Sequence, residues 1–113
     1  MIEEQLFTLI FAFYQNKVHE NAKIHNFWDT LPKEDEDEIR RWFCSLTGIL
    51  MREAAEVFES IRKREDAHVG EELADVVIMA MDIASGLNID LGNEIILKMG
   101  INTTRQSKHG KAF

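Results

Sequence analysis

The apolar residues of this chain recur every three or four positions over long stretches, and Pro32 is its one proline. This spacing is typical of amphipathic α-helices, whereas a β-rich fold needs more turn residues than one proline and six glycines. We therefore expect an all-α fold. Four helices are predicted: from about Glu3 to near Ala22, from Lys33 or Glu34 to Glu65, from Val69 or Gly70 to Ser85, and from Leu91 to about Thr104.

The residues near the ends of these segments support the helices. The second segment begins in an acidic run, 34–38, and ends in a basic run, 62–64, so that both charges suit the helix dipole. We interpret the acidic run as a helix start rather than a binding tail. Gly48 is a candidate bend within this helix, and Asp90 is a good N-cap for the fourth helix.

The first and third helices carry more apolar surface than four helices of this length would enclose. The first has a broad aromatic and aliphatic arc, and the third is apolar nearly all round. We expect a four-helix bundle-like protomer that homo-oligomerisation completes, as a dimer or a dimer of dimers. The chain is long enough for one small core and shows no linker, so residues 1–113 are predicted to form a single domain.

Charge and hydropathy limit the classes of partner. No run approaches the about 18 apolar residues that cross a bilayer, and the first residues lack the basic region of a signal peptide. The net charge of −7 disfavours a nucleic-acid backbone as partner. The single cysteine, Cys44, excludes an internal disulfide and fits a reducing, cytoplasmic compartment. We expect Cys44 on the core side of its helix rather than as a nucleophile.

Two pairs of carboxylates stand out in the middle of the chain. Glu53 with Glu56, and Glu72 with Asp75, are each three positions apart, so on a helix the members of a pair share a face. Glu56 and Glu72 are 72 − 56 = 16 positions apart, which allows one helix to end and a second to return beside it. Four carboxylates at close range repel one another unless cations lie between them. The pattern predicts a Mg²⁺ site, with Mn²⁺ as a substitute.

The alternative is a solvated acidic face, because Glu-x-x-Glu is common on exposed helices. The neighbouring residues favour the metal site. Glu53 falls within the apolar arc of its helix and Glu56 at the edge of that arc. Asp75 and Asp82 are the only polar residues between positions 73 and 84. A carboxylate on a mostly apolar helix is costly to bury unless it is paired or bound to a metal.

These motifs and several others carry a resemblance to a known family. The segments concerned are Glu53-x-x-Glu56, Glu71–Ile78 with Glu72-x-x-Asp75, Gly86–Leu91, Lys98–Lys111 with its Lys-His-Gly-Lys ending, His19–Ala22 and Phe27–Asp29. In this order they resemble the MazG-like group of the all-α nucleoside triphosphate pyrophosphohydrolases over nearly the whole chain. The family often has a further glutamate where this chain has Arg52, so the four acids are intact but that additional acidic side chain is missing.

The resemblance implies hydrolysis of a nucleoside triphosphate, often a deoxynucleotide, between the α- and β-phosphates, to a monophosphate and pyrophosphate. It implies Mg²⁺ held by Glu53, Glu56, Glu72 and Asp75, which would clamp the phosphates and lower the pKa of an attacking water. Two or more ions are expected, because one Mg²⁺ rarely takes four protein carboxylates. Glu53 or Glu56 would accept the proton of the water, and the sequence does not choose between these two catalytic candidates.

Residues near the C-terminus are predicted to contact phosphate oxygens. Lys98 and Asn102 are four positions apart and share a face of the fourth helix, and arginine and lysine suit phosphate recognition. The predicted contacts are Lys98, Asn102, Arg105, Lys108, His109 and Lys111. A solvated basic terminus is the alternative for the last four, and the resemblance favours the functional interpretation.

Polar and aromatic residues around the end of the first helix are predicted to contact the base or the sugar. They are His19, Asn21 and Trp28. A base stacks on an aromatic ring while polar groups read its edge. For Trp28 a core anchor is an equally open alternative, and for Phe27 and Trp42 a core position is the favoured interpretation.

Two other functions remain as alternatives. A di-iron bundle usually needs two Glu-x-x-His motifs, and the one match here is Glu65-x-x-His68 at a charged helix junction. A non-catalytic helical module would keep the acid pairs for metal binding, packing or regulation, and nucleotide turnover would separate it from an enzyme. Asp82 lies on the same side of its helix as Asp75, and we interpret it either as a hydrogen-bond acceptor near the site or as a residue that faces another subunit.

Overall fold

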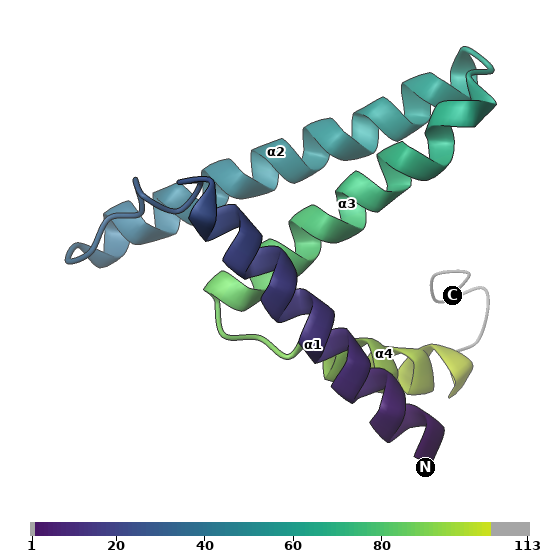
Figure 1. The fold of residues 1–113 in the computed structure, drawn as a ribbon, viewed down its shortest axis with the longest axis horizontal. Helices are drawn as coiled ribbons and strands as arrows, with labels where there is room; N and C mark the ends of the chain where they lie inside the picture. The colour runs from purple at the N-terminus through teal and green to yellow at the C-terminus, as the bar shows by residue number, and fades with distance from the viewer. Residues whose placement is uncertain (1, 105–113) are drawn as a thin grey trace.

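The computed structural model describes residues 2–104, which form four α-helices and no strand (Figure 1). The helices are α1 (Ile2–Ile24), α2 (Glu36–Arg62), α3 (Asp66–Gly86) and α4 (Leu91–Thr104). The predicted all-α class is confirmed. Within the described residues, no helix is long and apolar enough to cross a membrane.

The boundaries of α2 and α4 follow from their caps. The Asp35 side chain accepts from the backbone N–H of Asp37 at 2.8 Å and of Glu38 at 3.3 Å, so α2 begins after Asp35 rather than at Lys33 or Glu34. The Asp90 side chain accepts from the N–H of Asn93 at 3.1 Å, as an N-cap of α4 does. α2 is one continuous helix through the glycine at position 48, the candidate bend.

The turn between α2 and α3 lies three residues earlier in the chain than predicted. α2 ends at Arg62 and α3 begins at Asp66, three positions before the expected start at Val69. Arg64 has a φ of 58°, in the left-handed region, and reverses the chain there. Gly70 lies inside α3, so it does not mark the start of the helix. Nothing outside its own stretch of helix lies within 4 Å of the position that a Cβ would take.

The helices form an open arrangement rather than a closed bundle. α3 returns beside α2, α1 crosses the C-terminal part of α3, and α4 packs on α1 (Figure 1). The radius of gyration is 16.3 Å, where a compact domain of this length would have about 13 Å. The predicted bundle-like protomer is therefore found as an open chain of helix pairs: α2 with α3, α1 with α3, and α1 with α4.

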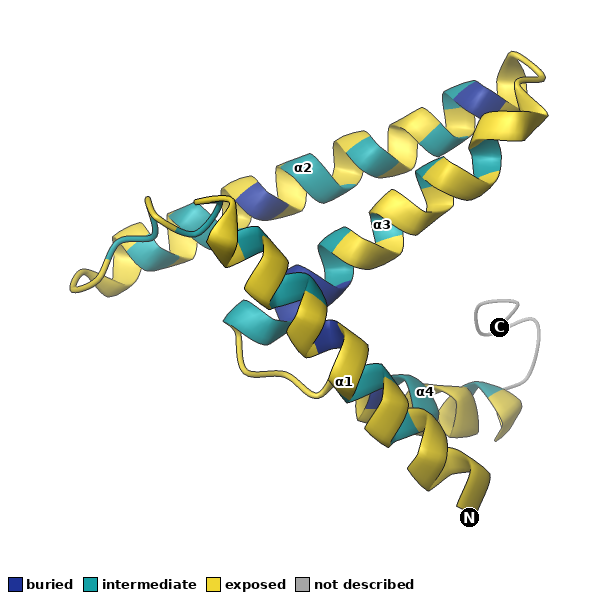
Figure 2. Ribbon diagram, in the orientation of Figure 1, coloured by how far each residue is buried: buried dark blue, intermediate teal, exposed yellow. Residues whose placement is uncertain are grey.

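Few side chains of the described residues are buried (Figure 2). The buried apolar residues are Leu46, Met81 and Ala84. The accessible surface is 8737 Å², whereas a folded monomer of 13.1 kDa would expose about 6,400 Å². α1 is apolar on two sides, because Phe11 packs on Gly92 of α4 while Ile10 and Phe13 are exposed.

An aromatic cluster holds the loop between α1 and α2 in place. The Trp28 ring lies 4.9 Å from that of Trp42 and 5.8 Å from that of Phe43, measured between centroids. It also lies so close to Gly86 of α3 that a Cβ there would overlap its six-membered ring. Phe27 is half-buried beside Trp28, at 6.2 Å between ring centroids. These contacts fix the loop against both α2 and α3.

One core assignment is wrong. Cys44, expected on the core side of its helix, is exposed. It lines an apolar groove of about 650 Å³ between α2 and the end of α3, together with Phe43 and Leu87. The periodicity placed Cys44 on an apolar side of α2, and the end of α3 borders that side without burying Cys44.

Candidate active site

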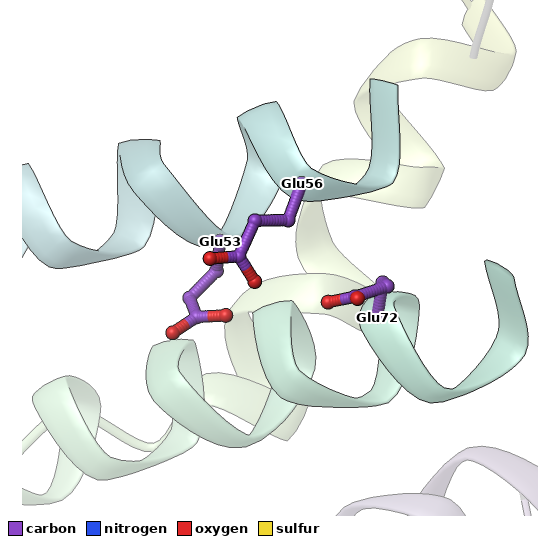
Figure 3. Close-up of side chains that lie close together, drawn as sticks. All are labelled: Glu53, Glu56 and Glu72. Atoms are coloured by element: carbon purple, nitrogen blue, oxygen red, sulfur yellow. The ribbon is translucent and has the colours of Figure 1, made fainter. Parts of the chain in front are cut away.

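Three of the four predicted metal ligands converge between α2 and α3 (Figure 3). Glu53 and Glu56 extend from α2 and Glu72 extends from α3, and one carboxylate oxygen from each lies within 4.8 Å of the others. Glu53 and Glu72 are half-buried, and Glu56 is exposed. We call these three residues the Glu cluster.

Asp75, the fourth predicted ligand, lies beside the Glu cluster rather than within it. It is one helical turn further along α3 than Glu72 and is exposed. Its side chain is shorter than a glutamate by one methylene. Asp75 nevertheless lines a hollow with Glu53, and its charge acts on Glu72.

The Glu cluster is electrostatically strained. Partial removal from water raises the pKa of Glu72, and a hydrogen bond with Glu56 and the charges of Glu56, Asp75 and Glu71 raise it further. One cation is near: Nη2 of Arg52 lies 3.7 Å from Oε1 of Glu53, with 65% of the Arg52 side chain exposed and 18% of the Glu53 side chain. A single solvated guanidinium contributes little to neutralising three carboxylates.

The residues of the Glu cluster fit a divalent cation. Carboxylate oxygens are the hard ligands that Mg²⁺ and Mn²⁺ prefer. Opposite ligands of an octahedral Mg²⁺ lie about 4.2 Å apart, so oxygens within 4.8 Å need only small side-chain movements to share an ion. A cation would also favour the ionised form of Glu72, which its surroundings disfavour.

A hollow of about 490 Å³ opens next to the Glu cluster, between α1, α2 and α3. Its lining comprises Lys17, Val18, Asn21, Ala22, Glu53, Asp75, Ile78, Met79 and Asp82. One wall is acidic and the α1 wall carries an ammonium and an amide. Asn21 was a predicted substrate contact. Lys17 was missed; its four-residue spacing from Asn21 places both on one face of α1, but that spacing does not show which helix the face meets.

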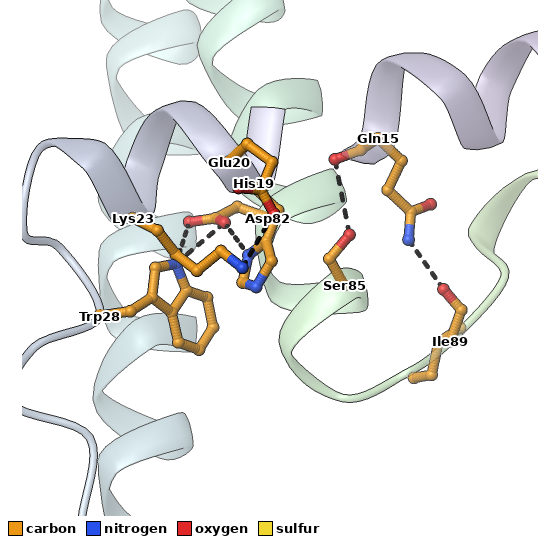
Figure 4. Close-up of polar contacts among 8 residues, drawn as sticks. All are labelled: Gln15, His19, Glu20, Lys23, Trp28, Asp82, Ser85 and Ile89. Atoms are coloured by element: carbon orange, nitrogen blue, oxygen red, sulfur yellow. Dashed lines mark hydrogen bonds and ion pairs between the residues drawn. The ribbon is translucent and has the colours of Figure 1, made fainter. Parts of the chain in front are cut away.

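His19 and Trp28 meet a buried carboxylate, Asp82 of α3 (Figure 4). His19 Nδ1 lies 2.7 Å from Asp82 Oδ1, and Trp28 Nε1 donates to Oδ1 at 3.0 Å and to Oδ2 at 3.1 Å. Of the two interpretations of Asp82, the hydrogen-bond acceptor is the one that the structure shows. Trp28 has the position of the core anchor that was the alternative to a substrate contact.

A comparison with protein families decides where the chain belongs. The family model described as the MazG nucleotide pyrophosphohydrolase domain matches residues 43–99, half of the chain. The chain is a member of the MazG family. The matched segment includes the Glu cluster and Asp75, whereas α1 lies outside it. No curated protein and no solved structure gives a significant match.

Two of the remaining predicted contacts of this MazG protein lie on α4, away from the hollow. Lys98 and Asn102 are on α4, which packs on α1, and neither belongs to the Glu cluster or lines the hollow. Four more predicted contacts lie outside the described residues: Arg105, Lys108, His109 and Lys111. Glu65 and His68, the single di-iron-like motif, are exposed at the α2–α3 turn and outside the Glu cluster.

The raised pKa of Glu72 predicts that Glu72→Gln has opposite effects on the stability of this MazG protein without and with Mg²⁺. The raised pKa means that the folded state binds the Glu72 proton more tightly than the unfolded state does, so stability is lost as pH rises from about 4.5 through the folded pKa. At pH 7.5 without metal, Glu72→Gln should therefore have a Tm equal to or above that of the wild type. Saturating Mg²⁺ should stabilise the wild type by about 2.7 kcal/mol at 100 times its Kd, but not the variant.

Thermal unfolding with and without Mg²⁺ measures both effects. Glu71→Gln is the matched control, because Glu71 is the exposed neighbour of Glu72 and lies outside the Glu cluster. A Glu72→Gln protein that gains as much from Mg²⁺ as Glu71→Gln does would contradict the assignment of Glu72 as a ligand.

Proposed function

We propose that this protein hydrolyses nucleoside or deoxynucleoside triphosphates to the monophosphate and pyrophosphate with Mg²⁺, for which Mn²⁺ can substitute. The observation that carries the proposal is the convergence of Glu53, Glu56 and Glu72 in a chain of the MazG family. A triphosphate brings further negative charge to an acidic site, so binding requires cations between the two.

In this proposal the chain supplies the metal ligands and the group that accepts the proton of the water. Glu53, Glu56, Glu72 and Asp75 are proposed to hold the metal ions. When bound, these ions would offset the charge of the phosphates and lower the pKa of the attacking water. Glu53 is the better candidate for the proton acceptor, because it lines the hollow and Glu56 does not. The nucleophile is water, so no covalent intermediate forms on the protein.

The hollow between α1, α2 and α3 is the proposed nucleotide site. Its volume of about 490 Å³ lies in the usual range of small-molecule sites, about 300–1,000 Å³. The triphosphate is proposed to lie at the acidic end beside Glu53 and Asp75. Lys17 is placed to contact a phosphate oxygen, and the Asn21 amide is placed to read the base or sugar.

The residues of α4 are proposed to act across a subunit interface. Lys98 and Asn102 lie on α4, which packs on α1, and neither lines the hollow, so they are proposed to contact phosphate in the site of a second copy. The basic residues that follow them in the sequence lie outside the described residues and are also proposed to contact phosphate: Arg105, Lys108, His109 and Lys111. A dimer or a dimer of dimers would also cover the exposed apolar side of α1.

A nucleotide panel tests the function. Wild-type protein with Mg²⁺ and each of the common ribo- and deoxyribonucleoside triphosphates should release pyrophosphate and the monophosphate, with a kcat on the order of 1–10 per second for the best substrate. Chelation of the metal should stop the reaction. Release of orthophosphate would contradict cleavage between the α- and β-phosphates, and metal binding without turnover of any nucleotide would instead support the non-catalytic helical module.

A further inference from the structure

Asp82, His19 and Trp28 form a second polar cluster at the edge of the hollow, and none of them belongs to the Glu cluster. Asp82 is 4% exposed and accepts hydrogen bonds from α1 and from the loop that follows α1. We propose that Asp82 is a positioning residue, which fixes the rotation of α1 about its axis so that Lys17 and Asn21 face the nucleotide. This inference rests on the proposed function.

The contacts of Asp82 join three parts of the chain. An ionised carboxylate can only accept, so His19 of α1 donates through Nδ1 at 2.7 Å, and Trp28 of the loop donates through Nε1 at 3.0 and 3.1 Å. A carboxylate this far from water needs such partners, because burying an unpaired charge is costly. The side chain on α3 thus holds both α1 and the loop (Figure 4).

The position of His19 along α1 explains what this contact controls. His19 lies two residues after Lys17 and two before Asn21, and successive residues of a helix are about 100° apart around the axis. Lys17 and Asn21 line the nucleotide hollow, while His19 lines a neighbouring hollow with Ser85. A hydrogen bond that fixes His19 therefore fixes the direction of the two side chains on either side of it.

Trp28 supplies the rigid side of the arrangement. Asp82 and Gly86 are four residues apart and share a face of α3. Asp82 binds the indole N–H, and Gly86 admits the ring because it has no Cβ. The loop that leads out of α1 is thereby seated on the same face of α3 that holds His19. His19 and Trp28 then act on the nucleotide through the orientation of α1 rather than by contact with the base.

The positioning role of Asp82 is separate from metal binding, because the two involve different residues. The Glu cluster lies on α2 and α3 and contains none of these residues. Loss of the Asp82 contacts should therefore change how well the nucleotide is held and leave the Mg²⁺ affinity as it is. α1 and Trp28 also lie outside the segment that the family model matches, whereas Asp82 lies within it.

Steady-state kinetics with the best triphosphate tests the role of Asp82. Asp82→Asn keeps the shape of the side chain but replaces one accepting oxygen by an N–H group, which cannot accept a hydrogen bond. We expect KM to rise about tenfold and kcat to stay within about threefold of the wild-type value. Trp28→Phe, which keeps the ring and loses the N–H, should also raise KM. Trp42→Phe is the matched control, since its indole donates to Thr30 Oγ1 and not to Asp82. The Mg²⁺ titration midpoint should be the same in all four proteins.

The double variant distinguishes positioning from direct contact. If Trp28 acts through Asp82, then Asp82→Asn with Trp28→Phe should raise KM no further than Asp82→Asn alone, whereas independent contacts would multiply. Provided that the wild type turns over, three results would each overturn the role of Asp82 alone. They are KM increases that multiply in the double variant, a KM of Asp82→Asn equal to that of the wild type, and a shifted Mg²⁺ midpoint. If Asp82→Asn fails to fold by circular dichroism, Trp28→Phe carries the test, and a KM equal to that of Trp42→Phe overturns it. Absence of turnover in the wild type would overturn the proposed function and this inference together.

Discussion

Glu53→Gln is expected to lower pyrophosphate release at least about 100-fold while the helical content stays that of the wild type. The amide keeps the size of the carboxylate but can neither accept a proton nor supply a full negative charge to a cation. Glu53 is the member of the Glu cluster that also lines the hollow, so both losses fall on the reacting end of the substrate.

Initial rates of pyrophosphate release and far-ultraviolet circular dichroism measure this outcome. Glu59→Gln is the matched control on the same helix, because Glu59 pairs with Arg62 at 2.8 Å and lies outside the Glu cluster. An exposed pair of this kind contributes little to stability, so the control should retain its activity. Undiminished turnover by Glu53→Gln would show that the reaction does not use this acid.

The protein is also expected to form a dimer or a larger oligomer that charges on α1 disrupt. Ile10 and Phe13 are 55% and 56% exposed on the side of α1 that faces away from α4, and lysines there would be buried unpaired in an interface. Ile10→Lys with Phe13→Lys should shift the mass towards that of a monomer, with pyrophosphate release down at least about tenfold because α4 of one copy serves the site of another.

Light scattering coupled to gel filtration gives the mass directly. Gln5→Lys is the control, since it adds a charge of the same sign to an exposed polar position of the same helix. A wild type that is monomeric at all concentrations, or a double variant that keeps the oligomeric mass, would contradict the interface on α1. Retained activity in a monomeric variant would contradict the role of α4 across subunits.

The local part of the site could be predicted from the sequence, because helix geometry alone decides it. Three-residue spacing fixes which side chains share a face, and the interval between Glu56 and Glu72 allows a hairpin, so the convergence of acids from two helices could be predicted. The position of Asp75 does not follow, because it depends on the reach of one side chain and on how α3 packs along α2.

The parts that failed depend on contacts between distant segments. Lys17 joins the site only because α1 crosses α3 next to the acids, and periodicity within α1 carries no information on that crossing. Asp82 was recognisable as a buried acceptor on an apolar helix, but its donors, 54 and 63 positions away, were not. Cys44 shows the reverse error, since an apolar arc predicts burial but not which neighbour provides it.

The α2–α3 turn places the acids at matching levels on two helices. Glu56 precedes Arg64 by eight residues and Glu72 follows it by eight, since 64 − 56 and 72 − 64 are equal. An added or deleted turn residue would slide one helix by about 1.5 Å and rotate it by about 100°, although the turn is about 12 Å from these acids. The length of the three-residue connection thus sets whether acids from the two helices face one another.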